Sequence, residues 1–130
     1  MLLTVLSLLV LFQFKHLFCD YFLQGKYMLG KFNEKNWCCP LLAHVGVHAI
    51  GTMIIVAIFA KLFPITWTVA ISAVLIDVVF HFTMDRIKVV YSKKYSTQDK
   101  QFWWWLGVDQ TVHHLTHYFI IFLLVASVLV

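Results

Sequence analysis

Long runs of apolar residues, broken by polar stretches, account for most of this chain. Four runs lie at about residues 1–23, 40–63, 65–90 and 102–130. Each run reaches the roughly 20 residues that an α-helix needs to cross a bilayer. Because backbone groups cannot stay unpaired in lipid, the pattern predicts an all-α polytopic membrane protein. We expect an antiparallel bundle of four transmembrane helices, in a single integral membrane domain that covers residues 1–130.

The connections between the apolar runs are of two kinds. Residues 25–39 and 91–101 are polar and contain most of the lysines of the chain. The second and third runs are instead joined by a short turn that ends at Pro64, a residue that cannot continue a helix. Such a short turn predicts that these two helices form an antiparallel hairpin.

The composition excludes a soluble protein. Hydrophobic residues make up 62% of the 130 residues and charged residues only 12%, against roughly 25% charged residues in an ordinary soluble domain. The formal net charge is +4, but a nucleic-acid-binding protein needs its basic residues on a folded polar face. Since so little polar surface remains, we expect the lipid bilayer as the partner and no nucleic acid.

The first apolar run is expected to remain in the mature protein as a helix. A cleaved signal peptide has positive charge before its apolar run and small residues after it. Here the first basic residue is Lys15, which lies toward the far end of the run. The pattern therefore does not fit a removable targeting segment.

Basic residues are distributed unequally between the two sides of the predicted bundle. Nine of them flank or occupy the first and third connections: Lys15, Lys26, Lys31, Lys35, Arg86, Lys88, Lys93, Lys94 and Lys100. Only Lys61 lies at the opposite side. Since cytoplasmic loops carry an excess of Lys and Arg, we expect both long connections in the cytoplasm and both termini outside.

Ionisable residues recur inside the predicted helices, one pair in each helix. The four pairs are His16 with Asp20, His44 with His48, His81 with Asp85, and Asp109 with His113. A spacing of four residues places both side chains of a pair on the same face of a helix. An ionisable group near the middle of a membrane costs roughly 2.5–3.5 kcal/mol on insertion scales, so such groups usually face the bundle interior and serve a function.

The four pairs also share one depth in the membrane. Two pairs lie near the ends of the odd-numbered helices and two near the starts of the even-numbered ones, which meet at the cytoplasmic half of an up-down bundle. Five imidazoles and three carboxylates suit a borderline divalent cation such as zinc, manganese or iron. Since eight ligands exceed the needs of one ion, we expect two ions. The alternative is a structural network of hydrogen bonds between the helices.

Further polar residues lie beside the predicted ligands. We expect Gln24 and Gln110 to orient ligands, because hydrogen bonds from outer residues fix the tautomers of metal-bound histidines. Asp77 lies one turn deeper than His81 and is expected to support the ligands or relay protons. His117, one turn deeper than His113, is placed in the same outer group, as a further ligand or its support.

The order of these motifs resembles a known family. The chain contains HLFCDYFLQ at residues 16–24, HVGVH at 44–48, HFTMD at 81–85 and DQTVH at 109–113. The set resembles the bacterial and phage membrane-protein family called domain of unknown function 3307, and it covers nearly the whole chain. That family is in turn similar to predicted membrane-bound metal-dependent hydrolases. The resemblance implies the bacterial inner (plasma) membrane as the location.

Three classes of function fit these residues. The first is a metal-dependent hydrolase of a phospho- or ester-containing, membrane-associated substrate, in which Asp20, Asp85 and Asp109 ligate or bridge the ions and a histidine shuttles protons. The second is a membrane di-iron oxidoreductase, although such enzymes carry a pattern richer in histidine. The third is a non-catalytic membrane subunit, or an ion or proton pathway, whose polar cluster is structural.

The predicted orientation can be tested at Cys38 and Cys39, which lie at the end of the first polar connection. Because the basic residues place this connection in the cytoplasm, a membrane-impermeant thiol reagent should label both cysteines in inverted vesicles and neither in intact cells. A Cys38→Ser/Cys39→Ser variant provides the background. Labelling from outside intact cells would reverse the orientation.

Overall fold

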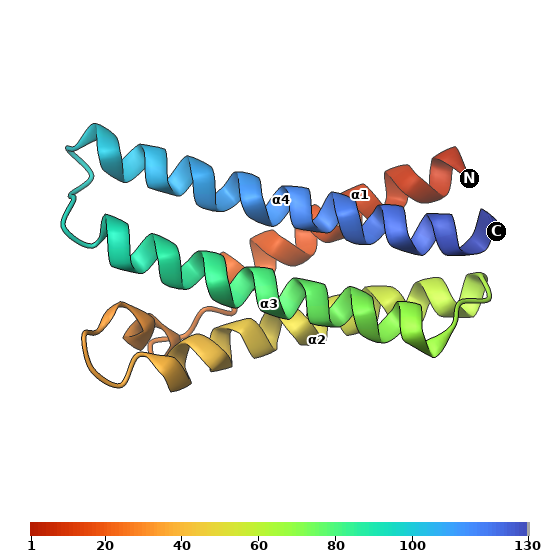
Figure 1. Ribbon diagram of the computed structural model, residues 1–130, viewed down its shortest axis with the longest axis horizontal. Helices are drawn as coiled ribbons and strands as arrows, with labels where there is room; N and C mark the ends of the chain where they lie inside the picture. The colour runs from red at the N-terminus through yellow and green to blue at the C-terminus, as the bar shows by residue number, and fades with distance from the viewer. Residues whose placement is uncertain (130) are drawn as a thin grey trace.

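The structure is a computed structural model that describes residues 1–129, and this part of the chain is helical, without strands. Its four long helices are α1 (Leu2–Leu17), α2 (Cys38–Leu62), α3 (Trp67–Ser92) and α4 (Lys100–Leu129), drawn in Figure 1. A π-helical turn, η1 (Phe18–Phe22), extends α1, and a 3₁₀ turn, η2 (Met28–Phe32), lies in the first connection. All four helices are long and apolar enough to cross a membrane. The prediction of an all-α, four-helix membrane bundle is confirmed.

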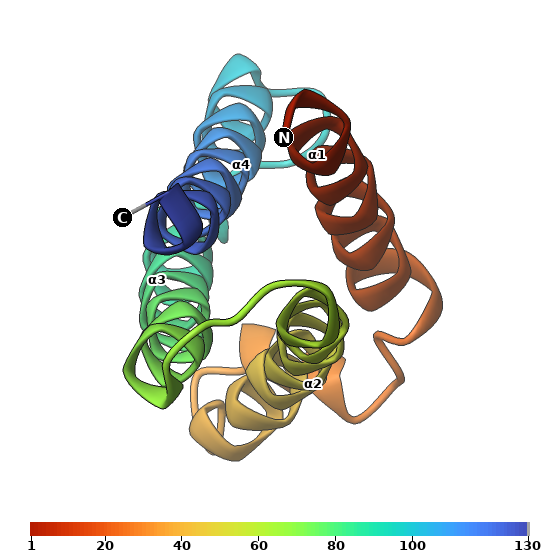
Figure 2. The ribbon, with the colours of Figure 1, turned by 90° about the vertical axis from the view of Figure 1, so that its right-hand side faces the viewer.

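The helices alternate in direction and form a ring. Figure 1 shows both termini and the α2–α3 turn at one end of the bundle, which we call the terminal end. The two longer connections lie at the other end, the loop end. Seen along the bundle in Figure 2, each helix lies beside the next, and α1 returns beside α4. The inward faces of all four helices therefore meet in one common interior.

The α2–α3 hairpin is defined by a helix stop and a helix cap. After α2 ends at Leu62, Phe63 adopts an extended conformation with φ −137° and ψ 136°. This is the conformation that the following Pro64 favours in its predecessor. Thr66 then caps α3, with its hydroxyl oxygen accepting a hydrogen bond of 3.3 Å from the backbone N–H of Val69.

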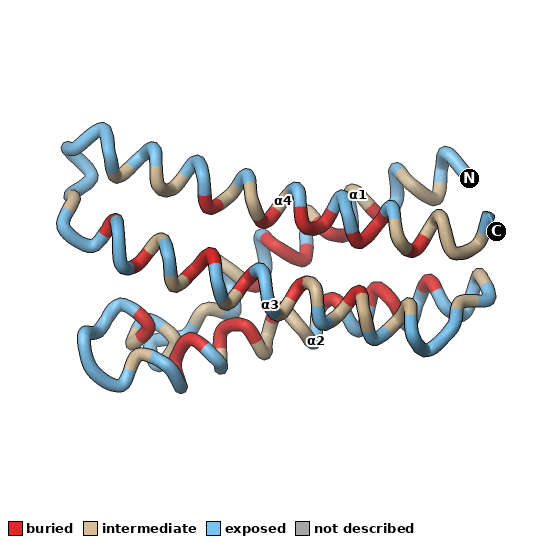
Figure 3. Tube along the Cα trace, in the orientation of Figure 1, coloured by how far each residue is buried: buried red, intermediate tan, exposed pale blue. Residues whose placement is uncertain are grey.

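The interior of the terminal half is an apolar core. It consists of Leu8, Phe12, Ile55, Val56, Phe59, Ala73, Ile120, Ile121 and Leu124, contributed by all four helices. In Figure 3 the buried positions follow the sides of the helices that face one another. The histidines and aspartates of the four predicted pairs lie outside this core, in the interior of the loop half.

The outer surface of the bundle is strongly apolar. Leu3 is 76% exposed, Phe122 64% and Trp67 84%. A helix on the surface of a water-soluble bundle carries polar residues on its outward face. These exposures therefore agree with an outer surface that contacts lipid.

Gly51 allows α1 to approach α2 closely. A Cβ atom added at this position would lie 2.8 Å from Cγ of Lys15 and 3.7 Å from Sγ of Cys19. Gly46, on the same helix, has open space around the corresponding position. Gly51 thus leaves room for the Lys15 side chain to enter the interior.

We expect Gly51→Ala to destabilise the bundle by about 1–3 kcal/mol, the usual cost of overpacking a filled interior. Gly46→Ala is the matched control and should be neutral or stabilising by up to about 1 kcal/mol, because alanine favours helix. Unfolding midpoints in the same detergent measure both. Equal effects of the two substitutions would contradict the close approach of Lys15.

Candidate metal centre

The eight residues of the predicted pairs all lie in the interior of the loop half. We call them the polar centre: His16, Asp20, His44, His48, His81, Asp85, Asp109 and His113. Seven of them are buried, and Asp20 is partly buried. Each helix contributes one pair, as its spacing of four residues requires for side chains on one helical face. The structure therefore brings together residues that are up to 97 positions apart in the sequence.

The π-helical turn η1 carries Asp20 at the end of the first membrane helix. Its wider geometry is visible in the hydrogen bond of 2.9 Å from the Leu23 N–H to the Phe18 carbonyl, five residues earlier. π-helical turns are rare and occur frequently at functional sites. Here the turn holds the Asp20 carboxylate against three histidines.

These three histidines contact both oxygens of Asp20. Nε2 of His48 lies 3.0 Å from Oδ1, within hydrogen-bond distance, and Nε2 of His44 lies 3.3 Å from the same oxygen. Nε2 of His16 lies 3.2 Å from Oδ2. One carboxylate thus joins α1 to both histidines of α2.

Asp20, His44, His48 and His81 form a group with the composition of a metal site. One ligand atom from each residue lies within 4.8 Å of all the others. Two ligands bound at about 2.0–2.1 Å in a tetrahedral arrangement lie about 3.3 Å apart. The distances of 3.0 and 3.3 Å from Asp20 Oδ1 to the α2 histidines match that spacing. This group can hold one ion.

A second group consists of His81, Asp85 and His113, again with one ligand atom of each within 4.8 Å of the others. The ring of His81 lies between the other histidines, with centroids 3.6 Å from His48 and 4.0 Å from His113. Asp85 also reaches the first group, because its Oδ2 lies 3.3 Å from Nε2 of His44. The two groups are therefore contiguous and share His81.

Several imidazole nitrogens of the polar centre are buried without a hydrogen-bond partner in residues 1–129. Both ring nitrogens of His44, His81 and His113 are in this condition. Leaving a buried polar atom unsatisfied costs about 1–3 kcal/mol. A bound cation would satisfy such atoms, so the donor set fits a metal ion.

Two lysines neutralise carboxylates of the polar centre, which the sequence did not predict. Nζ of Lys31 donates to Oδ2 of Asp85 at 2.6 Å, and Nζ of Lys88 donates to Oδ2 of Asp109 at 2.7 Å. Lys31 comes from η2 and not from a membrane helix, so no helical spacing relates it to Asp85. Asp20 has no lysine partner among the described residues.

Lys15, which we expected among the basic residues that flank the first connection, lies inside the bundle. It is only 7% exposed and its Nζ donates to Oδ2 of Asp77 at 2.7 Å. The Thr52 hydroxyl donates to the same oxygen at 2.7 Å, and Nε2 of His117 lies 3.4 Å from the other. The reason is that a buried carboxylate needs a positive partner. A lysine within an apolar run was the sequence signal for this pair.

The outer polar residues occupy different places. Gln110 lies beside the polar centre, where it accepts a hydrogen bond of 3.1 Å from His16 Nε2 and donates one of 3.1 Å to Asp109 Oδ2. Asp77 and His117 belong to the Lys15 network, although the His117 ring still lies 5.5 Å from that of His16. Gln24 lines a cavity at the loop end.

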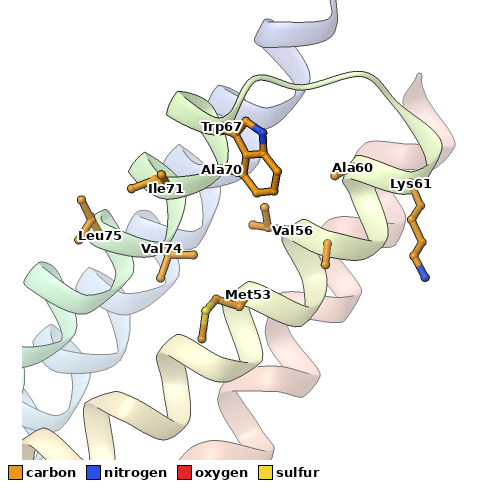
Figure 4. Close-up of a pocket in the computed structure, with 10 residues that line it drawn as sticks. Met53, Val56, Ala60, Lys61, Trp67, Ala70, Ile71, Val74 and Leu75 are labelled. Carbon is orange, nitrogen blue, oxygen red and sulfur yellow. The ribbon is translucent and has the colours of Figure 1, made fainter.

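That polar cavity has a volume of about 140 Å³ and adjoins the polar centre. Asp20, Asp85 and Asp109 line it together with Lys31, Lys88 and Gln110. A larger groove of about 510 Å³ lies in the terminal half between α2 and α3, as Figure 4 shows. Its lining is apolar apart from Lys61, and its residues Met53 and Leu75 are exposed on the outer surface. Of these two, the small polar cavity is therefore the better candidate for a reaction site, because charged side chains line it.

Comparison with known proteins identifies a family. A family model described as Protein of unknown function (DUF3307) matches residues 8–130. No curated protein and no solved structure matches the chain. The match includes α2, α3, α4, the part of α1 from residue 8 onward, and every residue of the polar centre.

Proposed function

The chain belongs to the DUF3307 family, whose function is unknown, and we propose its function from the polar centre. The protein is a small integral membrane protein that binds divalent metal within its bundle. It uses this metal to hydrolyse a phospho- or ester-containing, membrane-associated substrate. The similarity to predicted membrane-bound metal-dependent hydrolases is part of this proposal.

One observation carries the metal site. Nε2 of His44 lies 3.3 Å from a carboxylate oxygen of both Asp20 and Asp85, yet it finds no hydrogen-bond partner in the described part of the chain. An ion held by the two carboxylates would give this nitrogen the partner that it lacks. With three imidazoles and one carboxylate, the first group suits zinc, manganese or iron.

Two positions account for the donors of the polar centre. The first is Asp20, His44, His48 and His81, and the second is His81, Asp85 and His113. The first fills more readily, because Asp20 has no lysine to displace, whereas Lys31 competes for Asp85. The remaining two residues of the polar centre are His16, which contacts Asp20, and Asp109, which lines the polar cavity.

The residues around the cavity would perform the hydrolysis. A bound metal would supply a Lewis acid and an activated water. The water oxygen would form the new bond to phosphorus or to the acyl carbon as the bond to the leaving oxygen breaks. Asp109, which lines the cavity, would accept the proton of the water and return it to the leaving oxygen.

We place the loop end in the cytoplasm of a bacterial cell, in accordance with the excess of basic residues beside it. The polar cavity is lined by residues of η1, η2, α3 and α4 at this end. A substrate would therefore approach from the cytoplasmic face of the inner membrane.

A non-catalytic subunit is the second candidate, and the lysine pairs are the observation in its favour. Lys15, Lys31 and Lys88 each meet one carboxylate at 2.6–2.7 Å. Such pairs neutralise the charge of three of the four interior aspartates without any ion. They leave the imidazole nitrogens of His44, His81 and His113 unexplained, which is why we favour metal. A di-iron oxidoreductase shares the metal site and differs in the metal bound.

Elemental analysis tests the metal site. The protein is purified in detergent, incubated with metal and then separated from unbound metal. Wild type should retain zinc or manganese. His81→Ala should lose most of this metal, because His81 belongs to both groups. His114→Ala is the matched control, since its ring lies beside His16 but outside both groups. Bound iron would favour the oxidoreductase. Wild type without metal would favour the structural network.

Turnover of phospholipid, lipid phosphate and carboxylic ester panels tests the hydrolase. We expect metal-loaded wild type to be active and Asp109→Asn to lose at least about 100-fold, the usual contribution of a positioned proton acceptor. Asp99→Asn is the control: Asp99 lies in the α3–α4 connection, where hydrogen bonds from the backbone and side chain of Ser96 lower its pKa.

The hydrolase proposal fails if metal-loaded wild type turns over none of these substrates while Asp109→Asn still complements the cellular role of the protein. That combination would leave a non-catalytic membrane subunit as the function.

A further inference from the structure

Two lysines line the polar cavity, where they could bind an anion in addition to the metal of the polar centre. Lys31 and Lys88 enter it from η2 and α3, and their side chains are only 8% and 24% exposed. Lysine is rarely buried to this extent unless it is paired. Both ammonium groups are held by aspartates that also belong to the polar centre.

We infer that Lys31 and Lys88 bind the phosphate group of a phosphate monoester when metal occupies the polar centre. This inference rests on the proposed function and specifies its substrate class. It concerns a group that lies in the polar cavity and meets the metal on one side and the two ammonium groups on the other.

The first argument is competition for the same carboxylate oxygen. Oδ2 of Asp85 lies 2.6 Å from Nζ of Lys31 and 3.3 Å from Nε2 of His44. An ion held by Asp85 and its neighbouring histidines would share this oxygen with the ammonium group. Metal binding at the second group would therefore weaken the ion pair and free the hydrogen-bond donors of Lys31 for another anion.

The same argument applies to Lys88. Its partner oxygen, Oδ2 of Asp109, also accepts a hydrogen bond of 3.1 Å from Gln110. If Asp109 turns toward metal or a proton, the Gln110 amide and the Lys88 ammonium are left as donors at the cavity wall. Ammonium groups bind phosphate as point charges.

Charge determines when an anion can enter. The cavity is lined by three aspartates and two lysines, which gives one net negative charge and repels an anion. One divalent ion at the polar centre reverses the sign of this charge. The two binding events are therefore coupled, and each ligand must raise the affinity for the other by the same factor.

The size and edge of the cavity fit the phosphate of a lipid or of a free monoester. A volume of about 140 Å³ holds a few water molecules or one tetrahedral oxyanion. Tyr21 and Phe32 line the same cavity and are 68% and 46% exposed. An apolar chain attached to the phosphate would pass over these two rings to the lipid-facing surface.

Binding of inorganic phosphate to metal-loaded and metal-free protein tests this inference. Calorimetry in detergent measures the dissociation constant, and circular dichroism checks the fold of each variant. We expect metal to tighten phosphate binding at least tenfold in wild type. Lys88→Gln should abolish this difference, and Lys88→Arg, which keeps the charge, should restore it.

Lys93→Gln is the matched control. Lys93 follows α3 on the same end of the bundle, but it is half exposed and pairs with Glu34 at 3.1 Å, outside the cavity. Its replacement removes the same charge and should leave the metal effect at the wild-type value. A loss equal to that of Lys88→Gln would mean that general surface charge attracts the phosphate, which overturns the inference.

Vesicles distinguish a lipid phosphate from a free one. Metal-loaded protein is placed in phosphatidylcholine vesicles. In one arm a soluble phosphate monoester is added to the solution, and in the other arm the vesicles contain phosphatidic acid. Competition of phosphatidic acid against phosphate at the cavity identifies a lipid source, and competition by the soluble monoester alone identifies a free one.

Failure of the inference differs from failure of the metal site. Protein that binds metal but shows the same phosphate affinity with and without it overturns the inference alone. Protein that retains no metal overturns both proposals. Metal content is therefore measured on every sample used for phosphate binding.

Discussion

A carboxylate inside a membrane bundle must meet positive charge or hydrogen-bond donors, and this requirement organises the loop half of the protein. Four aspartates enter the interior: Asp20, Asp77, Asp85 and Asp109. Three of them are met by a lysine at 2.6–2.7 Å. Among the described residues, Asp20 pairs with histidines and with no lysine. We therefore propose the metal site at Asp20.

The same constraint explains the division of the bundle. Apolar side chains fill the terminal half, where four helices can pack without polar partners. The polar side chains gather at the loop end, within reach of η1 and η2, which are short irregular turns and not membrane-length helices. The connection can thereby send Lys31 back to Asp85, and the π-helical turn can carry Asp20 to α2. Residues of the first connection and of the membrane helices therefore meet at the same polar centre.

Helical spacing made much of this arrangement predictable. Four helices followed from the length of the apolar runs, and pairs such as His44 and His48 had to share a face because they lie four residues apart. The partners of the carboxylates were not predictable in this way. Lys31 reaches Asp85 across 54 residues through a connection without helical periodicity. Lys15 was expected to flank the first connection, whereas its carbon chain lies against Gly51 in the interior. Such contacts depend on tertiary packing and leave no repeat in the sequence.

In the function that we propose, the polar centre binds the metal and the cysteines do not. X-ray absorption spectroscopy at the edge of the bound metal tests this directly, because it reports the atoms around the ion. We expect nitrogen and oxygen ligands at about 2.0–2.1 Å for zinc, with the outer-shell scattering of imidazole rings. Sulfur at about 2.3 Å would place the ion at one or more of the free cysteines, Cys19, Cys38 and Cys39. Sulfur ligation, or a spectrum without imidazole, would show that the polar centre does not bind the metal.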